Sequence, residues 1–515
     1  MERNKARICV PVCVRRVDEL ADNVRRAQEV ADIVELRIDY VDPAEVDTAL
    51  NVSAALPKTA SLPFILTFRP ADQGGARPIA MAERVAFWHK IQLGVLESFP
   101  DFADVELELL ETDEIRHQLS SKRLICSHHD FAGVPGDLEN IYIRMAAANA
   151  SILKIAVQAG DATDCIPVFN LLDRAQREGR ELIAIAMGQA GVMTRILGPS
   201  RGSFLTYGSL DEDTGTAPGQ VTARELREVY RIDSIDRETE IIGVIGRPVA
   251  HSISPYIHNA ALAQANLNAV FIPFEVHDVD GFMLRMVRKS SREIEWNLRG
   301  IAVTAPHKSA VMKHLDWIEP AASEIGAVNT IVVHDGGLHG YNTDAAGFIG
   351  PLRRRIGSLE GLRCAVIGAG GAARAVVWAL RQERAFVTVF CRDPEKAKAI
   401  RDQFEVNCRS LADPTFEAVD VVINATPLGT RGEQEKETPA TAEQLRGVRL
   451  AYDLVYNPLE TQFMREARQA GCATVGGLEM LIAQAVEQFR LWTGKEPDVE
   501  SMGDGAKRAL NKPGP

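Results

Sequence analysis

The sequence predicts an α/β protein in which an N-terminal (β/α)8 TIM barrel is followed by a two-lobed α/β unit that contains a Rossmann domain. Three observations predict this fold class. Up to about residue 232, eight short apolar runs alternate with longer amphipathic stretches, as in βα units around a parallel sheet. A charged stretch at 231–240 then precedes a new apolar run. From Gly361 a second βαβ pattern begins with a glycine-rich turn.

The predicted barrel occupies residues 1–232. Its strands are expected at 7–13, 32–38, 64–68, 103–109, 123–127, 152–157, 182–187 and 203–207. A strand at 241–245 opens a second lobe, which is expected to comprise 240–345 and about 470–495. The Rossmann lobe is expected at 346–469, and the tail at 496–515 is expected to be poorly ordered.

The composition is that of a globular protein without a polyanionic partner. A chain of 515 residues is too long for one core, and its net charge of -12 disfavours nucleic acid or anionic membranes, which bind clustered Lys and Arg. No apolar run approaches the ~20 residues of a membrane span and the N-terminus does not resemble a signal peptide, so we expect a cytoplasmic protein. The eight cysteines lack metal-binding spacing, which predicts reduced thiols and no metal site.

Polar side chains gather where the predicted barrel strands end, which is the face on which such barrels build active sites. They are Glu35, Arg37, Arg69, His128, His129, Lys154 and Arg195. Lys154 lies in the apolar run 151–157 with no carboxylate nearby in sequence, so burial should favour the neutral, nucleophilic amine. The alternative is a solvent-facing lysine. For His128 and His129 the residues alone allow a purely structural role.

A lysine, a histidine and several arginines at one barrel mouth suit imine chemistry on an anionic keto compound. The lysine would condense with a ketone, the histidine would move protons, and an arginine would bind a carboxylate.

Six segments, in order, resemble the motifs of type I 3-dehydroquinate dehydratases. They are Glu35-Leu-Arg37-Ile-Asp39, Thr67-Phe-Arg69, His129-Asp-Phe131, Lys154-Ile-Ala156, Met187-Gly188 with Arg195, and Ala217-Pro-Gly-Gln220. The resemblance implies that Lys154 forms a Schiff base and that His129 is the acid and base. It implies substrate-binding roles for Glu35, Arg37, Arg69, Arg195, Thr216 and Gln220. Thr216 stands where a serine is usual and keeps the hydroxyl, whereas Gln73 stands where a glutamate is common, and the lost carboxylate could slow a proton transfer.

The turn Gly368-Ala-Gly370-Gly371-Ala-Ala373 follows the predicted strand 363–367 and opens a helix. Its glycines would let a pyrophosphate approach the amides at a helix N-terminus, which is typical of dinucleotide binding. Arg392 and Lys396 follow the next predicted strand, 386–390, and favour the 2′-phosphate of NADP over NAD. NAD remains the alternative cofactor, because the adjacent Asp393 could bind ribose hydroxyls. Asp393 could also simply cap a helix.

Seven segments between about 241 and 493 resemble the motifs of shikimate dehydrogenases. They lie at 246–259, 303–308, 326–330, 341–344, 424–429, 453–458 and 476–484. The resemblance implies a catalytic pair, Lys308 and Asp344, where the residues alone would allow a surface ion pair. It places Ser252, Ser254, Thr304, Asn329, Tyr456 and Gln484 around the substrate. It assigns cofactor contacts to Gly368, Ala369, Gly370, Gly371, Ala372, Ala373, Arg392, Lys396, Asn424, Thr426 and Gly477.

The two resemblances together imply a bifunctional, cytoplasmic enzyme of the shikimate pathway, which leads to chorismate and the aromatic amino acids. A lyase would dehydrate 3-dehydroquinate to 3-dehydroshikimate, and an oxidoreductase would reduce that product to shikimate with NADPH. One alternative is that the second half acts on quinate. Another is a non-catalytic sensor of quinate or shikimate, although all four catalytic side chains are present. The sequence indicates neither an oligomeric state nor whether the product passes directly between the sites.

Overall fold

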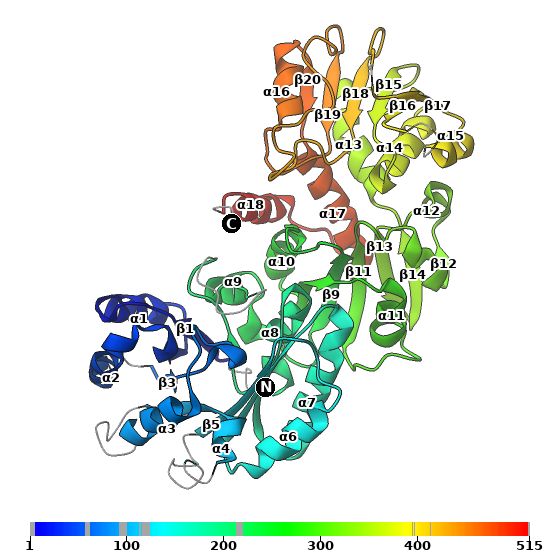
Figure 1. Ribbon diagram of the computed structural model, residues 1–515. Coiled ribbons are helices and arrows are strands. Elements are labelled where there is room, and N and C mark those ends of the chain that lie inside the picture. Colours follow the sequence, from blue (N-terminus) through cyan, green and yellow to red (C-terminus); the bar gives the residue numbers. More distant parts are fainter. Residues whose placement is uncertain are drawn as a thin grey trace.

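The computed structural model forms three sheets with their own helices. It describes residues 6–56, 62–91, 100–112, 115, 124–212, 220–393, 395, 397–412 and 414–512. Figure 1 shows a barrel at one end, a middle lobe, and a second sheet-containing lobe at the other end. This arrangement confirms the predicted fold class.

The first sheet has eight parallel strands in the order β7-β6-β5-β4-β3-β2-β1-β8, and a bridge between Leu182 and Ser203 joins its two edges. The strands are β1 (Ile8–Val12), β2 (Ile33–Arg37), β3 (Phe64–Thr67), β4 (Phe102–Glu106), β5 (Leu124–Asp130), β6 (Ile152–Gln158), β7 (Glu181–Met187) and β8 (Thr206–Tyr207). The helices are α1 (Leu20–Gln28), α2 (Val46–Ala55), α3 (Met81–Lys90), α4 (Leu107–Leu110), α6 (Leu138–Ala147), α7 (Cys165–Arg177), α8 (Val192–Leu197) and α9 (Ala223–Glu228). The strands are almost wholly buried because side chains fill the interior and helices cover the outside.

Three barrel strands differ by three residues at one end from their predicted bounds, and one of them, predicted at 203–207, begins only at Thr206. The strand predicted at 103–109 ends at Glu106, because the apolar residues that follow are buried in the short helix α4 instead. The strand predicted at 123–127 continues to Asp130, so His128 and His129 lie within β5 and pair with β6. Of the polar residues late in this strand, His129 lines the pocket at the barrel mouth.

The middle lobe contains a mixed six-stranded sheet in the order β10-β9-β11-β13-β14-β12. Its strands are β9 (Glu240–Gly246), β10 (Ala269–Glu275), β11 (Asn297–Val303), β12 (Trp317–Ile318), β13 (Thr330–His334) and β14 (Gly337–Tyr341). Its helices are α10 (Ser254–Gln264), α11 (Val279–Phe282) and α12 (Pro320–Ile325), and α13 (Asp344–Ile356) leads into the last lobe.

The last lobe has a fully parallel sheet in the order β17-β16-β15-β18-β19-β20, which is the Rossmann arrangement. Its strands are β15 (Arg363–Ile367), β16 (Phe386–Cys391), β17 (Asn407–Ser410), β18 (Val421–Asn424), β19 (Leu450–Asp453) and β20 (Ala473–Val475). Its helices are α14 (Gly371–Gln382), α15 (Lys398–Phe404) and α16 (Gln462–Gln469). Because β20 pairs with β19, the chain leaves this lobe at α17 (Gly477–Thr493), later than the predicted residue 470.

The prediction of a poorly ordered tail is wrong for residues 496–512, and residues 513–515 lie outside the described ranges. Residues Val499–Leu510 form α18, whose N-cap Asp498 accepts a hydrogen bond from the Glu500 amide. The helix buries Met502 and Ala506 and packs along α10 (Figure 1). Glycine usually disfavours a helix. Here, however, Gly505 lets α18 approach α10 closely, because a Cβ at this position would lie 2.3 Å from the Tyr256 carbonyl oxygen.

No helix within the described ranges is both long and apolar enough to cross a membrane. In the same part of the chain, no cluster of three or more His, Cys, Asp or Glu side chains is arranged to hold a metal ion. All eight cysteines are free thiols.

Candidate active sites

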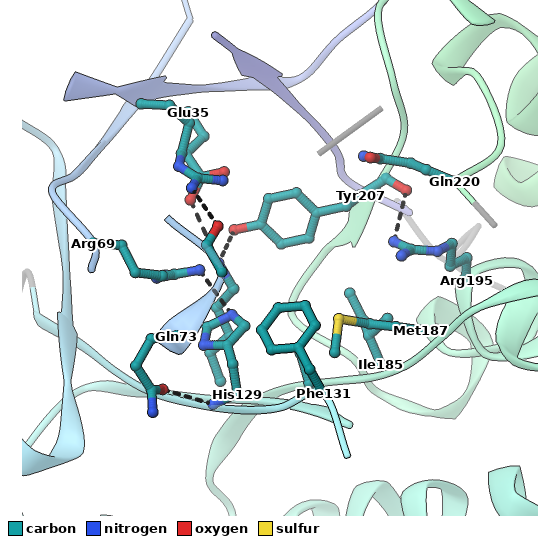
Figure 2. Close-up of a pocket in the computed structure, with 14 residues that line it drawn as sticks. Glu35, Arg69, Gln73, His129, Phe131, Ile185, Met187, Arg195, Tyr207 and Gln220 are labelled. Carbon is teal, nitrogen blue, oxygen red and sulfur yellow. Dashed lines mark hydrogen bonds and ion pairs between the residues drawn. The ribbon is translucent and has the colours of Figure 1, made fainter. Parts of the chain in front are cut away.

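The barrel has a pocket at the C-terminal ends of its strands (Figure 2), and Lys154 of β6 is one of the residues that line it. The pocket brings together Glu35, Arg37, Arg69, His129, Lys154, Arg195 and Gln220. These are all the predicted dehydratase residues except Thr216, which lies outside the described residues. His128 does not line the pocket, so the geometry favours His129 as the reactive histidine.

Carboxylates lie against Lys154, contrary to the expectation of an isolated amine. Lys154 Nζ is 2.7 Å from Asp104 Oδ2 on β4 and 3.4 Å from Glu35 Oε1 on β2. Two carboxylates therefore contact the amine, and they offer it a counter-charge and a proton acceptor. Sequence reasoning missed Asp104 because its strand lies far away in the chain. An acidic residue inside the buried run 102–106 was the available signal.

The carboxylates beside Lys154 are ionised. Burial alone would raise the pKa of Asp104, but the Arg69 and Lys154 charges hold it well below its usual value. For Glu35, too, burial opposes ionisation, and the Lys154 and Arg37 charges outweigh it and lower the pKa. Both carboxylates therefore act as hydrogen-bond acceptors.

His129 is 7 % exposed and is neutral. Burial, followed by the charges of Arg69 and Lys154, lowers its pKa well below the usual value. Arg69 Nη1 lies 2.8 Å from His129 Nε2, and because a guanidinium only donates, Nε2 accepts this hydrogen bond. The lone pair of a neutral imidazole thus faces the pocket from β5.

Arg195 of α8 is a buried cation at one side of the pocket. It is 2 % exposed, and its Nη1 donates to the Tyr207 carbonyl oxygen at 3.4 Å. Burial lowers its pKa to about 10. By contrast, Arg37 pairs with Asp39 and Arg69 with Asp104, each at 2.7 Å. Among the described residues Arg195 has no carboxylate partner, so it is the pocket's available site for an anion.

Gln73 lies at the pocket rim and takes a positioning role. Its Oε1 accepts a hydrogen bond from the backbone amide of His129 at 3.0 Å (Figure 2). A glutamate could accept the same bond, so the glutamine preserves the backbone contact while removing a negative charge beside the imidazole.

A second cavity of about 310 Å³ lies between the middle lobe and the Rossmann lobe. It brings together the eight predicted residues of the reductase substrate site, namely Ser252, Ser254, Thr304, Lys308, Asn329, Asp344, Tyr456 and Gln484. Gln488 of α17 also lines it and was missed, since a glutamine one turn beyond Gln484 carries no distinctive sequence signal.

Lys308 and Asp344 form a close pair, with 2.5 Å between Nζ and Oδ2. Their side chains are 18 % and 9 % exposed, so this is not a surface ion pair. Asn329 Nδ2 donates to the other carboxylate oxygen, Oδ1, at 2.8 Å. Asp344 is thus fixed between an ammonium and an amide, and the lysine points into the cavity. The neighbouring His307 donates through Nε2 to the Val276 carbonyl oxygen at 2.8 Å, which is a structural contact.

The glycine-rich turn between β15 and α14 borders the same cavity. Gly368 has φ +117°, and a Cβ there would lie 2.8 Å from the Ala425 carbonyl oxygen, so only glycine fits. No atom lies within 4 Å of a Cβ position at Gly370, and a Cβ at Gly371 would lie 3.6 Å from Lys308 Cδ. The turn therefore offers open backbone next to Lys308.

The other predicted cofactor residues lie in different surroundings. Ala372 and Gly477 line the cavity, and Arg392 is exposed at the end of β16. In contrast, Ala373 is buried in the α14 core. Asn424 is buried and bonded to Thr426 at 2.6 Å and to Asp453 at 2.9 Å, so it shapes the turn after β18. Ala369 is half-buried in the glycine-rich turn, and Lys396 lies outside the described residues.

Comparisons with known families match four separate segments of the chain. Residues 8–237 match the model of type I 3-dehydroquinase, and residues 244–331 match the shikimate dehydrogenase substrate binding domain. Residues 352–450 match the shikimate/quinate 5-dehydrogenase model, and residues 477–502 match the shikimate 5'-dehydrogenase C-terminal domain.

Individual relatives agree with the family models. The chain is 32 % identical to a chloroplastic bifunctional 3-dehydroquinate dehydratase/shikimate dehydrogenase of Arabidopsis thaliana, over 96 % of this chain and 83 % of the relative. It is 40 % identical to the shikimate dehydrogenase (NADP(+)) of Methanocaldococcus jannaschii, over 52 % of this chain and 96 % of the relative. A crystal structure of a shikimate dehydrogenase in complex with NADP+ matches with a TM-score of 0.51 and 38 % identity, over 54 % of this chain and 98 % of that one.

Proposed function

The chain belongs to the bifunctional 3-dehydroquinate dehydratase/shikimate dehydrogenase family, and we propose that its two sites act in sequence through an imine on Lys154 and then with NADPH. The barrel dehydrates 3-dehydroquinate. The dehydrogenase half reduces the product, 3-dehydroshikimate, to shikimate. The two chemistries connect because the enone released by the first site carries the ketone that the second reduces.

The unpaired Arg195 is the observation that carries the dehydratase proposal. A buried cation without a partner is costly, and a bound carboxylate removes that cost while fixing the orientation of the substrate. Arg195 and Lys154 lie in one pocket, so a keto acid held by its carboxylate presents its carbonyl to the amine. Glu35, Arg37, Arg69 and Gln220 provide the remaining polar contacts.

Lys154 first gives a proton to a neighbouring carboxylate and then adds to the substrate ketone. The protonated imine draws electrons from the adjacent carbon and acidifies its hydrogen. His129 is neutral and can take this proton at Nε2 once the substrate replaces the Arg69 contact. The same imidazolium then protonates the departing hydroxide.

In the dehydrogenase half, Lys308 acts as the proton donor. Hydride addition to a ketone leaves an alkoxide, and the ammonium of Lys308 is the acid that faces the cavity. Asp344, held by Asn329, keeps the ammonium in place. Ser252, Ser254, Thr304, Tyr456 and Gln484 supply hydroxyl and amide groups suited to a polyol acid.

The residues around the glycine-rich turn fit a dinucleotide phosphate. Gly368 and Gly370 leave the backbone open at the start of α14, where amides and the helix dipole favour a pyrophosphate. Arg392 is exposed at the end of β16 and makes no ion pair with any described residue, so it can bind a 2′-phosphate. When bound, NADPH supplies the hydride.

A two-stage optical assay tests the proposal. Purified protein is given 3-dehydroquinate while the enone absorbance is followed, and NADPH is then added while its oxidation is followed. We expect enone growth and then NADPH consumption. Binding of both ligands without turnover would indicate a sensor, and faster turnover with quinate than with shikimate in the reverse direction would indicate the quinate alternative.

Two single variants separate the halves. Lys154→Ala should lose dehydration and keep reduction of supplied 3-dehydroshikimate, and Lys308→Ala should do the reverse. Borohydride added with substrate should trap a covalent adduct on Lys154 in the wild-type protein, and the absence of an adduct would contradict the imine.

A further inference from the structure

Tyr207 is the third group in contact with the amine of Lys154. It ends β8, and its hydroxyl oxygen accepts a hydrogen bond from Lys154 Nζ at 2.8 Å. The same ammonium lies 4.4 Å from the centre of the tyrosine ring. Figure 2 shows the ring reaching from the side of Arg195 into the middle of the pocket. The side chain is therefore placed to touch any atom that becomes bonded to Nζ.

Tyr207 remains a neutral phenol. Burial, followed by the negative charges of Glu35 and the neighbouring groups, raises its pKa well above the usual value. A neutral hydroxyl can accept one hydrogen bond and donate another at the same time. Asp104 and Glu35, the other groups at Nζ, are ionised and can only accept. Among the described residues that contact Nζ, Tyr207 alone combines both capacities.

We propose that Tyr207 is a catalytic proton relay during imine formation on Lys154, an inference that rests on the imine chemistry proposed above. When the neutral amine adds to the ketone, nitrogen gains a positive charge and oxygen a negative one. These two atoms share one carbon, so a hydroxyl bonded to the nitrogen also reaches the oxygen. Tyr207 takes a proton from nitrogen as it gives its own proton to oxygen, and it ends the step as the neutral phenol.

The remaining steps balance without another reactant. The carboxylate that accepted the first ammonium proton returns it to the new hydroxyl group, which leaves as water. The nitrogen lone pair then forms the C=N bond and leaves a protonated imine. The net change is a ketone plus an ammonium giving a protonated imine plus water, with Tyr207 and the carboxylate both restored.

The substitution Tyr207→Phe tests this role, because it keeps the ring and removes only the hydroxyl. Tyr142→Phe is the matched control, since Tyr142 is also buried in the barrel and its hydroxyl donates to Glu178 at 2.7 Å, outside the pocket. The full-length protein is mixed with 3-dehydroquinate in a single turnover. Borohydride quenching gives the rate of adduct formation on Lys154, and absorbance gives the rate of enone appearance.

We expect adduct formation to slow by about 100-fold in Tyr207→Phe, within the usual range for a lost proton-transfer group. Enone should then appear without a lag behind the adduct, because the later elimination is unaffected. The control variant and the reductase rates should match the wild type. Adduct formation at the wild-type rate in Tyr207→Phe would overturn the relay. A lag between slowed adduct formation and enone appearance would also overturn it, because the elimination is then slowed as well, as loss of a merely positioning residue would cause.

Two further measurements separate failure of the relay from failure of the imine mechanism. Absence of an adduct in the wild-type protein would contradict the imine itself rather than the relay. If the variant does not fold, the relay can be tested on the wild-type protein. The rate of adduct formation is then measured in mixtures of H2O and D2O. A relay moves two protons in one step, so the rate should depend on the deuterium fraction with curvature, and a straight line would contradict it.

Discussion

Asp104 accepts a hydrogen bond from Lys154 across the barrel interior, with 2.7 Å between Oδ2 and Nζ. Its other oxygen, Oδ1, lies 2.7 Å from Arg69 Nη2, so one carboxylate balances two buried cations. Asp104→Asn should cost the barrel about 3–5 kcal/mol, because both cations lose their nearest counter-charge. It should also reduce dehydratase kcat/KM by at least about 100-fold, because the nearest proton acceptor for the ammonium is lost.

Urea unfolding and steady-state kinetics measure these two effects. Asp211→Asn is the control, since it removes an exposed carboxylate whose ion pair with Arg26 contributes at most about 1 kcal/mol. Full dehydratase activity in Asp104→Asn would show that Glu35 alone can take the ammonium proton.

Gln73→Glu should restore a negative charge beside His129. The glutamine already accepts a hydrogen bond from the His129 amide, so a carboxylate fits the same place. Its charge opposes the effects of Arg69 and Lys154, which together with burial lower the pKa of His129. We expect the acid limb of the dehydratase kcat/KM profile to move to higher pH, with the reductase profile unchanged. If the limb stays in place, the charge at this position does not influence the imidazole.

The sequence was sufficient for the fold because the alternation of apolar strands and amphipathic helices is local and repeated. It was not sufficient for the contacts of Lys154, since Asp104 and Tyr207 meet it only through the register of a closed parallel barrel. The helix α18 escaped prediction because Gly503 and Gly505 resemble flexible residues, and only its packing on α10 reveals their use. Motif resemblance supplied the residues proposed to react, whereas the charge balance around them required the three-dimensional structure.

Arg392→Ser tests the cofactor assignment. Arg392 is exposed at the end of β16, where a 2′-phosphate is commonly bound. Loss of one charge-assisted bidentate contact removes about 1.5–3 kcal/mol, so KM for NADPH should rise by roughly 10-fold or more. The KM for NADH should change little, and dehydration should not change. Equal changes for both cofactors would assign Arg392 to a part of the dinucleotide that they share.

Glu106→Gln should change how barrel stability depends on pH. Burial raises the pKa of Glu106 from 4.5 to about 7, and its nearest cation, Arg84, lies 3.6 Å away. A raised pKa in the folded state means that stability is complete below about pH 4 and declines as pH rises through 7. The decline amounts to roughly 3 kcal/mol and should be absent in the glutamine variant. Urea unfolding at pH 5 and pH 8 measures it, and parallel pH dependence in both proteins would refute this assignment.

Two glycines in one turn of α18 give a matched test of how this helix is held. A Cβ at Gly505 would lie 2.3 Å from the Tyr256 carbonyl oxygen, whereas the nearest atom to a Cβ at Gly503 is Ile482 Cδ1 at 4.0 Å. Gly503→Ala should therefore stabilise the protein by up to about 1 kcal/mol through helix propensity alone. Gly505→Ala should instead destabilise it by about 1–3 kcal/mol, because backbone atoms of α10 cannot move aside without shifting the helix. Thermal unfolding and limited proteolysis of residues 496–512 distinguish the two, and equal stabilisation by both substitutions would mean that α18 is not packed against α10 at this distance.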